Sequence, residues 1–255
     1  MRRALPLLLA SVVGAGLFAW PLLTAGGPGA IAVGIGVATV AALLALEVGI
    51  RRLDSRALAL LAALSALDAG ARAAIVTGIG GFSPIFLLVL CGGYVFGPSF
   101  GFLVGALSLL VSALVTGGLG PWLAYQLFAV GWVGALAGLV GRRRRGRPTR
   151  RDVVQLVIVG VGAGYGFGAV MDLWQWTFYA SSPGLGFHPG MAPTVAVGHF
   201  ARFYLATSLT YDTFRAVGNG LLVGAVGLPV LAALARLRSR RTAELIRQPG
   251  GLRRP

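Results

Sequence analysis

Residues 122–141 of this chain read WLAYQLFAVGWVGALAGLVG, and the four residues that follow, 142–145, are all arginine. An uncharged apolar run of this length matches the roughly 20 residues that an α-helix needs to cross the hydrocarbon core of a bilayer. Arginines directly beside such a run mark the cytoplasmic side under the positive-inside rule. The stretch therefore predicts a transmembrane helix that ends at the inner face of a membrane.

The composition of the whole chain agrees with this interpretation. Of its 255 residues, 56% are hydrophobic and 11% are charged, whereas an ordinary soluble domain has about 25% charged residues. The net charge of +15 comes from arginines, and these lie in short clusters between apolar runs. This distribution indicates topology rather than a basic face for docking, so we expect no nucleic acid as a partner.

Apolar runs along the chain predict an all-α integral membrane protein. We place spans at 5–25, 30–50, 56–75, 83–97, 99–116, 122–141, 153–180 and 203–235. The last is long enough either to project in part from the bilayer or to break near 218–220. With the N-terminus inside, almost all arginine clusters face the cytoplasm. We therefore expect a multi-pass protein of the cell membrane with both termini cytoplasmic.

The first apolar run has a second interpretation. It follows two arginines and ends in small residues, as a secretory signal peptide does. Its apolar stretch is long for that role, so we favour a retained helix. Cleavage would leave the remaining topology unchanged.

Polar side chains inside the predicted spans define a candidate binding site. Ionisable groups are costly within a membrane and indicate function by default. On the predicted topology, polar groups from four helices lie mainly in the outer half of the bilayer, which predicts a pocket open to the outside. Aromatic rings beside amides and charges suit a planar ligand. The predicted substrate-binding residues are Trp122, Tyr125, Gln126, Asp172, Trp176, Tyr211, Asp212, Arg215 and Asn219.

Two simpler interpretations of these residues stay open. Asp68 and Arg72, and likewise Asp212 and Arg215, are three or four residues apart and can be ion pairs that only neutralise each other. The tryptophans can belong to the aromatic belt at the membrane interface.

Several short motifs resemble those of enzymes, but the predicted structure around each of them argues against that function. Residues 97–101, GPSFG, have the spacing of a nucleophile elbow, but both histidines are predicted on the opposite side of the membrane. Gly160, Gly164 and Gly168 fit close helix packing better than dinucleotide binding. The two histidines and one cysteine are unclustered, and the chain has no lysine for a P-loop. We therefore expect no enzymatic activity, no catalytic residue, no metal and no cofactor.

An ordered set of motifs resembles a known family over residues 56–236. The motifs are LDAGAR at 67–72, GGYVFGPSFGFLVG at 92–105, GPW at 120–122 with Gln126 and GW at 131–132, MDLW at 171–174, and YD at 211–212 with Asn219. In this order they resemble the substrate-specific S component of energy-coupling factor (ECF) transporters, especially the actinobacterial type.

The resemblance implies a six-helix core, here residues 53–236, that binds a vitamin or cofactor precursor; a cobalamin-like compound is one candidate. It also implies partners, namely a transmembrane T component and two cytoplasmic ATPase subunits. Residues 1–52 would add a two-helix extension, and residues 237–255 a basic cytoplasmic tail. The docking face implied by the resemblance would comprise Ala59, Ala62, Ala63 and Ala66.

The main alternative is a self-contained secondary transporter of a small planar solute, with Asp172 or Asp212 as a proton-coupled carboxylate. The chain shows no clear inverted repeat, which disfavours this alternative. A membrane enzyme is disfavoured by the scattered histidines, and a structural scaffold leaves the convergent polar groups unexplained.

Overall fold

The computed structural model describes residues 5–23, 28–74, 85–144 and 146–247. Within these ranges the chain forms helices and no strand, which confirms the all-α prediction. The helices are α1 (Leu5–Leu23), α2 (Pro28–Ile50), α3 (Ser55–Ala74), α4 (Ile85–Phe96), α5 (Pro98–Thr116), α6 (Leu123–Gly141), α7 (Arg150–Trp176), the short 3-10 helix η2 (Thr177–Tyr179), α8 (Pro193–Thr207) and α9 (Leu209–Arg247).

Six helices in the described ranges are long and apolar enough to cross a membrane: α2, α3, α5, α6, α7 together with η2, and α9. They correspond to six of the eight predicted segments. The other two segments, at α1 and α4, are apolar but shorter. The structure is thus compatible with a multi-pass membrane protein.

The predicted segment 203–235 is wrong at its start and at its break. The chain instead forms two helices that meet at Ser208, which ends α8 with φ −119°, and α9 continues through 218–220. The Ser208 hydroxyl bonds to other side chains, and such local bonds compete with helix formation. A Cβ at Gly220 would lie 3.1 Å from the Val161 side chain, so this glycine serves packing rather than a break.

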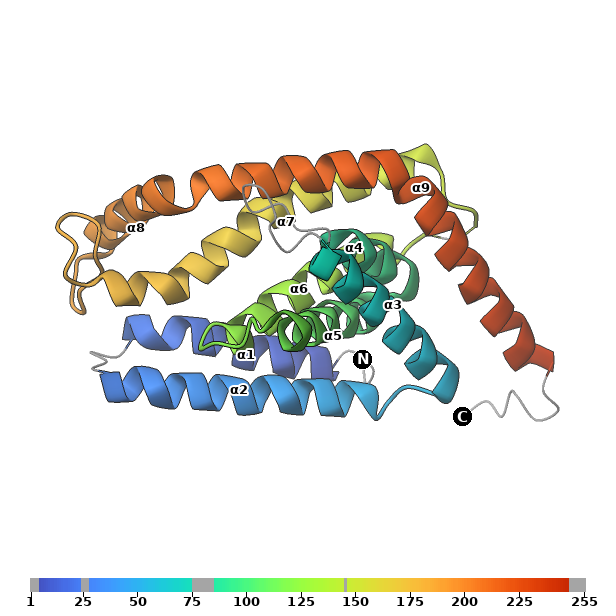
Figure 1. The fold of residues 1–255 in the computed structure, drawn as a ribbon, viewed down its shortest axis with the longest axis horizontal. Helices are drawn as coiled ribbons and strands as arrows, with labels where there is room; N and C mark the ends of the chain where they lie inside the picture. The colour runs from blue at the N-terminus through green and yellow to red at the C-terminus, as the bar shows by residue number, and fades with distance from the viewer. Residues whose placement is uncertain (1–4, 24–27, 75–84, 145, 248–255) are drawn as a thin grey trace.

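The last helix also extends beyond the predicted core boundary at 236. α9 contains Pro229 and bends sharply on its way to Arg247 (Figure 1). A proline in a helix interior removes a backbone hydrogen bond and is the usual cause of such a bend. The part of α9 after the bend therefore crosses the end of the bundle instead of continuing alongside α7.

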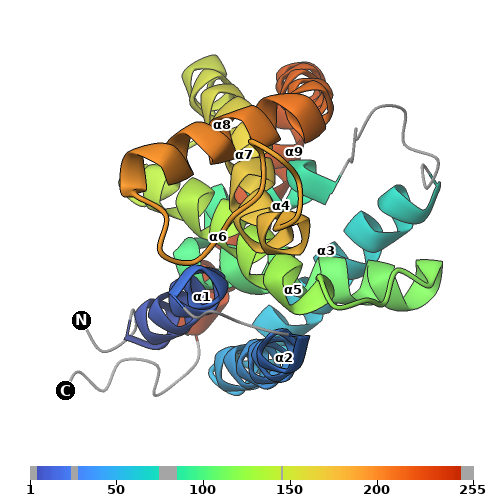
Figure 2. The same cartoon turned by 90° about the vertical axis from the view of Figure 1, so that its left-hand side faces the viewer.

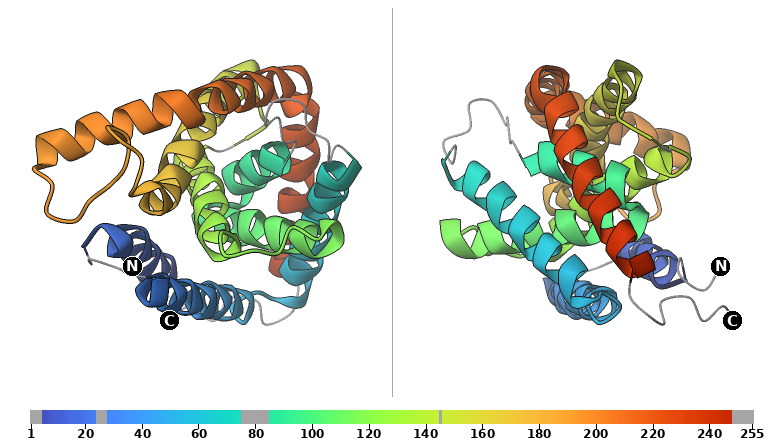
Figure 3. Two further views of the ribbon diagram at one scale, coloured as in Figure 1. Left: turned by 60° about the vertical axis from the view of Figure 1, so that its left-hand side comes forward. Right: turned by 90° about the vertical axis from the view of Figure 1, so that its right-hand side faces the viewer.

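The helices surround α4. Figure 1 places α7 and the first part of α9 along one side of the molecule and α1 and α2 along the opposite side, and Figure 2 agrees. Between them, α4 contacts α3, α5, α6, α7 and α9, as the left view of Figure 3 illustrates. Its Val89, Leu90 and Cys91 are fully buried. The lone cysteine is a core hydrophobe.

Glycines bring the backbones of α5 and α6 into direct contact. A Cβ at Gly134 of α6 would overlap the backbone carbonyl of Gly101 on α5, and one at Gly101 would overlap that of Gly134. Small residues at such crossings let helices approach closely where lipid supplies no hydrophobic drive for association. This contact fixes the centre of the bundle.

Replacing Gly134 by alanine is therefore expected to force the α5–α6 crossing apart and to lower the melting temperature in detergent, since overpacking a core costs about 1–3 kcal/mol. Gly162→Ala is the matched control, because no atom lies within 4 Å of a Cβ at that site. Equal melting temperatures for the two variants would contradict this packing.

The topology can be tested with the buried native Cys91 as a silent background. Ser181 and Arg143 are both exposed, in the connections after and before α7. Because the positive-inside rule places the arginine-rich connection in the cytoplasm, Ser181→Cys should react with an impermeant thiol reagent in intact cells. Arg143→Cys should react only after the cells are opened, and the reverse pattern would invert the predicted orientation.

Candidate functional site

The candidate site begins with a flat face on α7. A Cβ at Gly164 would lie 2.6 Å from the Cα of Ala216 on α9, and one at Gly168 would overlap the Asp212 carboxylate. This confirms that the glycines at 160, 164 and 168 form a helix-packing face. Because α9 lies so close, its polar side chains meet the backbone of α7 directly.

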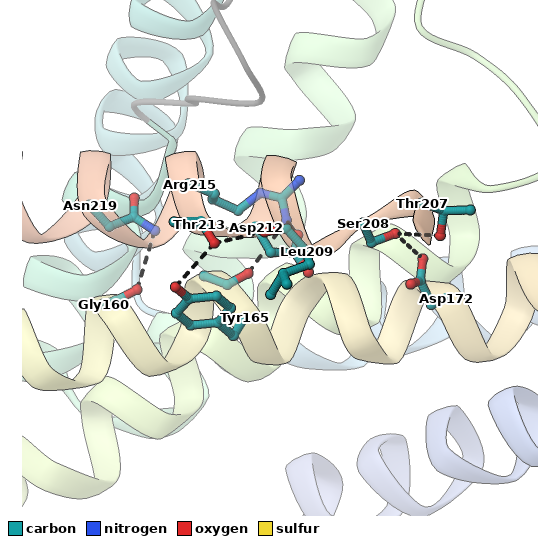
Figure 4. A network of polar contacts seen from close by, with 11 residues as sticks. Gly160, Tyr165, Asp172, Thr207, Ser208, Leu209, Asp212, Thr213, Arg215 and Asn219 are labelled. Carbon is teal, nitrogen blue, oxygen red and sulfur yellow. Dashed lines mark hydrogen bonds and ion pairs between the residues drawn. The ribbon is translucent and has the colours of Figure 1, made fainter. Parts of the chain in front are cut away.

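One half of the α7–α9 interface is a ladder of side-chain to backbone bonds (Figure 4). Asn219 Nδ2 donates to the carbonyl of Gly160 at 3.3 Å, and Arg215 Nη1 donates to that of Gly164 at 3.4 Å. Arg215 also forms an ion pair with Asp212, which realises the ion pair that their spacing allowed. Its guanidinium lies 4.9 Å from the centre of the Phe167 ring, so the charge is held by an anion and a ring.

The other half of the interface lies where α8 meets α9. The Ser208 hydroxyl donates to Asp172 Oδ1 at 2.8 Å, and the Thr207 and Ser208 hydroxyls are 3.2 Å apart. Tyr204 on α8 lies near enough to Asp212 to interact with it. The helix junction therefore anchors Asp172 directly and brings Tyr204 close to Asp212.

Each carboxylate keeps one unused acceptor. Asp172 is 3% and Asp212 1% exposed, and Oδ2 of each is buried without a hydrogen-bond partner. Arg215 pairs with Asp212, whereas the printed partner of Asp172 is the Ser208 hydroxyl, so Oδ2 of each carboxyl group is left to accept a hydrogen bond. Unpaired polar groups in a membrane interior are costly, so such groups call for a functional explanation.

The structure thus brings four of the nine predicted residues together: Asp172, Asp212, Arg215 and Asn219. Sequence reasoning did not identify Tyr165, Tyr204 or Ser208 as members of this interface; Tyr165 donates to Thr213 Oγ1 at 3.3 Å. The available signal was the Thr207-Ser208 pair, whose hydroxyls precede Asp212 by about one helical turn.

The predicted residues of α6 lie apart from this interface. Tyr125 is buried in the core, with its ring centre 5.3 Å from that of Trp174 and 5.1 Å from that of Phe18. Trp122 is 41% exposed at the start of the helix, and Gln126 is half-buried. A binding role for these three residues stays a prediction.

Two more predicted residues are engaged elsewhere or point outward. Trp176 is buried, donates to the carbonyl of Leu185 at 2.6 Å and packs against Phe187 and Phe200. Tyr211 is 57% exposed. Their part in binding likewise remains a prediction, whereas Trp176 visibly anchors the 180–192 connection over the end of α7.

This cover is held mainly by polar and aromatic contacts. His199 Nδ1 of α8 lies 2.8 Å from the carbonyl of Gly186, and Arg202 donates to that of Gly184 at 3.4 Å. Phe203 is the single residue of α8 that is fully buried, packed on Tyr179. Because α8 buries so little surface, its displacement from the bundle should cost little free energy.

A second buried polar cluster lies between α3 and α5. Asp68 is fully buried, and neither of its oxygens has a hydrogen-bond partner of normal geometry, although the Ser108 hydroxyl and the Leu88 backbone N–H lie near enough to interact with it. Ser65 and Ser112 are also buried and unbonded. The ion pair that the spacing of Asp68 and Arg72 allowed does not form; Arg72 acts only at longer range.

No protein-family model matches the sequence, and no curated protein or solved structure shows significant similarity to it. Among the described residues, no group of three or more His, Cys, Asp or Glu side chains could hold a metal ion.

Replacing the buried aspartate by asparagine should change the melting temperature differently in the two clusters. Asp212→Asn removes the anion that pairs with Arg215, and breaking a buried pair costs roughly 3–5 kcal/mol, so the melting temperature should fall markedly. Asp68→Asn removes a charge that has no cation within ion-pair distance, so the melting temperature should stay or rise. Thermal unfolding of both purified variants in one detergent checks this. An equally large fall for Asp68→Asn would reveal a stabilising partner for that carboxylate.

Proposed function

We propose that this chain is the substrate-binding membrane subunit of an ATP-driven importer of the ECF type, and that it takes up a vitamin or cofactor precursor. The observation that carries the proposal is an exposed alanine face on α3, defined as Ala59, Ala62, Ala63 and Ala66. All four side chains are exposed. The opposite face of α3 packs on α5 and α4, with the buried residues Ala57, Leu61, Leu64, Ser65, Asp68 and Ala69.

A smooth alanine face towards lipid favours a second helix as its neighbour. Lipid tails solvate leucine and valine as readily as alanine, whereas close helix approach requires small side chains. Large apolar residues are exposed on other helices, including Leu43 and Leu44 on α2 and Val154 and Ile158 on α7, and α3 itself exposes Leu58 and Leu67 beside the alanine face. The alanine face differs from these lipid-facing surfaces, which supports docking of a transmembrane partner such as a T component.

The interface between α7 and α9 supports the binding role. It places two buried carboxylates with unused acceptors beneath a weakly packed cover formed by α8 and the 180–192 connection. A ligand that carries hydrogen-bond donors would satisfy these oxygens when the cover opens. The chain has no lysine and no P-loop sequence, so on this proposal ATP hydrolysis belongs to the two cytoplasmic partner subunits.

The proposal predicts that docking and binding separate by mutation. Ala63→Leu should abolish co-purification with the T component and ATPase subunits, because leucine blocks close approach, while ligand affinity in detergent changes less than about twofold. Ala32→Leu, also at an exposed alanine but on α2, is the matched control and should retain the partners. Loss of ligand binding with intact partner association in Ala63→Leu would overturn the docking assignment.

The complementary variant is Asp172→Asn, which should weaken ligand binding by about tenfold or more, as expected when a buried charged acceptor is lost, and should spare partner association. Its control is Glu47→Gln, because Glu47 is exposed and pairs with Arg51 at 2.7 Å. Proton-driven uptake by the purified chain alone in liposomes would instead establish the secondary transporter with Asp172 or Asp212 as the coupled carboxylate.

A further inference from the structure

A separate cavity lies at the end of the bundle that carries the arginine-rich connection. It is lined by the end of α4, by residue 144 and residues 146–148 of the connection, by the start of α7 and by the part of α9 beyond Pro229. The right view of Figure 3 shows this last part of α9 crossing the bundle. The lining residues are Tyr94, Val95, Arg144, Gly146, Arg147, Pro148, Asp152, Ala235 and Arg238.

The wall of this cavity is a rigid polar network around Asp152, which is 1% exposed. The Tyr94 hydroxyl donates to Asp152 Oδ1 at 2.5 Å, and the Thr149 hydroxyl and backbone N–H each donate to Oδ2 at 2.7 Å. Arg144 forms an ion pair with the same carboxylate, and this hydrogen-bonded contact raises the pKa of Arg144. Asp152 therefore orients Arg144, whose side chain is still 39% exposed.

Two further arginines reach the cavity from different segments. Arg147 belongs to the connection and is exposed, whereas Arg238 is brought in by the bent end of α9 and donates to the carbonyl of Val95 at 2.8 Å. Among the lining residues Arg144 is paired with Asp152, and Arg147 adds a further positive charge. A cavity with this surplus favours an anion.

We propose that this cavity binds a phosphate group, a site that is independent of the transported substrate. The planar guanidinium fork matches phosphate oxygens better than any other side chain does. The apolar helices α4 and α6 end at Phe96 and Gly141 beside it, so the cavity lies at the level where phospholipid headgroups meet the protein. On the predicted topology this is the cytoplasmic leaflet, where basic pockets between helices hold anionic headgroups. The phosphate can come from such a lipid or from free inorganic phosphate.

A matched pair of arginines separates a defined site from general surface charge. Arg142 and Arg147 lie in the same connection and both are exposed, but only Arg147 lines the cavity. If the arginines only set the membrane orientation, substitution of either residue should have the same effect on anion binding. A phosphate site in this cavity requires that substitution of Arg147 weaken anion binding and that substitution of Arg142 leave it nearly unchanged.

The experiment measures binding of short-chain phosphatidylglycerol, short-chain phosphatidylcholine and inorganic phosphate to the purified full chain in neutral detergent. Arg147→Gln is expected to weaken phosphatidylglycerol binding by about tenfold, the effect of losing one charge-assisted hydrogen bond. Arg142→Gln should change it by less than about threefold, since exposed charges at a distance are screened. Arg238→Gln serves as a second cavity variant, and its melting temperature shows whether loss of the Val95 contact unfolds the helix end.

The three probes identify the source of the phosphate. Binding of phosphatidylglycerol but not of inorganic phosphate, lost in Arg147→Gln, supports a lipid headgroup site. Comparable binding of inorganic phosphate, lost in the same variant, supports a site for the free anion. Equal effects of Arg147→Gln and Arg142→Gln, or no binding of either anionic probe by the unaltered chain, overturn the proposal.

Discussion

The close contact between α7 and α9 is the constraint on which the rest of the structure depends. In a hydrocarbon interior, water cannot satisfy a polar group, so every donor and acceptor must find its partner inside the protein. The glycine face of α7 removes the side chains that would otherwise separate the helices, and α9 then places Asn219 and Arg215 against exposed carbonyls of its neighbour. Without that face, Asn219 and Arg215 would lose the backbone carbonyls of α7 as hydrogen-bond partners.

The same constraint explains which parts of the fold could be predicted. Apolar length predicts most of the segments: six of the eight correspond to helices long and apolar enough to cross a membrane, although the segment 203–235 was placed to begin too early. The break that we allowed near 218–220 does not form, because Gly220 packs against Val161 of α7, and neighbouring helices make glycine tolerable within a membrane helix. Ser208 breaks the helix instead, since its hydroxyl has specific partners. That choice depends on the position of Asp172 on another helix, which no local pattern of α8 or α9 contains.

The sequence predicted which residues of the site are polar or aromatic, but not which of them face the α7–α9 interface. Residues spaced by four drift by about 40° per step around a helix with 3.6 residues per turn. Tyr211 and Asn219, eight residues apart, therefore have different surroundings: Asn219 bonds to α7, whereas Tyr211 is 57% exposed. The face that packs is instead Asp212, Ala216, Asn219 and Val223, all at most 1% exposed. The rotation of α6 is set by aromatic contacts to α1 and α7, which place Tyr125 in the core and could not be inferred from its own sequence.

Continuity of α9 links the two ends of the molecule. One helix carries Asp212 and Arg215 in the interface with α7, bends at Pro229, and presents Arg238 to the end of α4. A displacement of its first part, such as a ligand entering between α7 and α9 would require, must be absorbed at the bend or passed to the Arg238–Val95 contact. Packed helices adopt discrete arrangements rather than deform continuously. The bend therefore determines whether the displacement stops there or reaches the Arg238–Val95 contact. An anion bound in the cavity that Arg147 and Arg238 line would hold the second part in place and direct the movement into the bend. Occupancy of that cavity and separation of α7 from α9 would then be physically coupled.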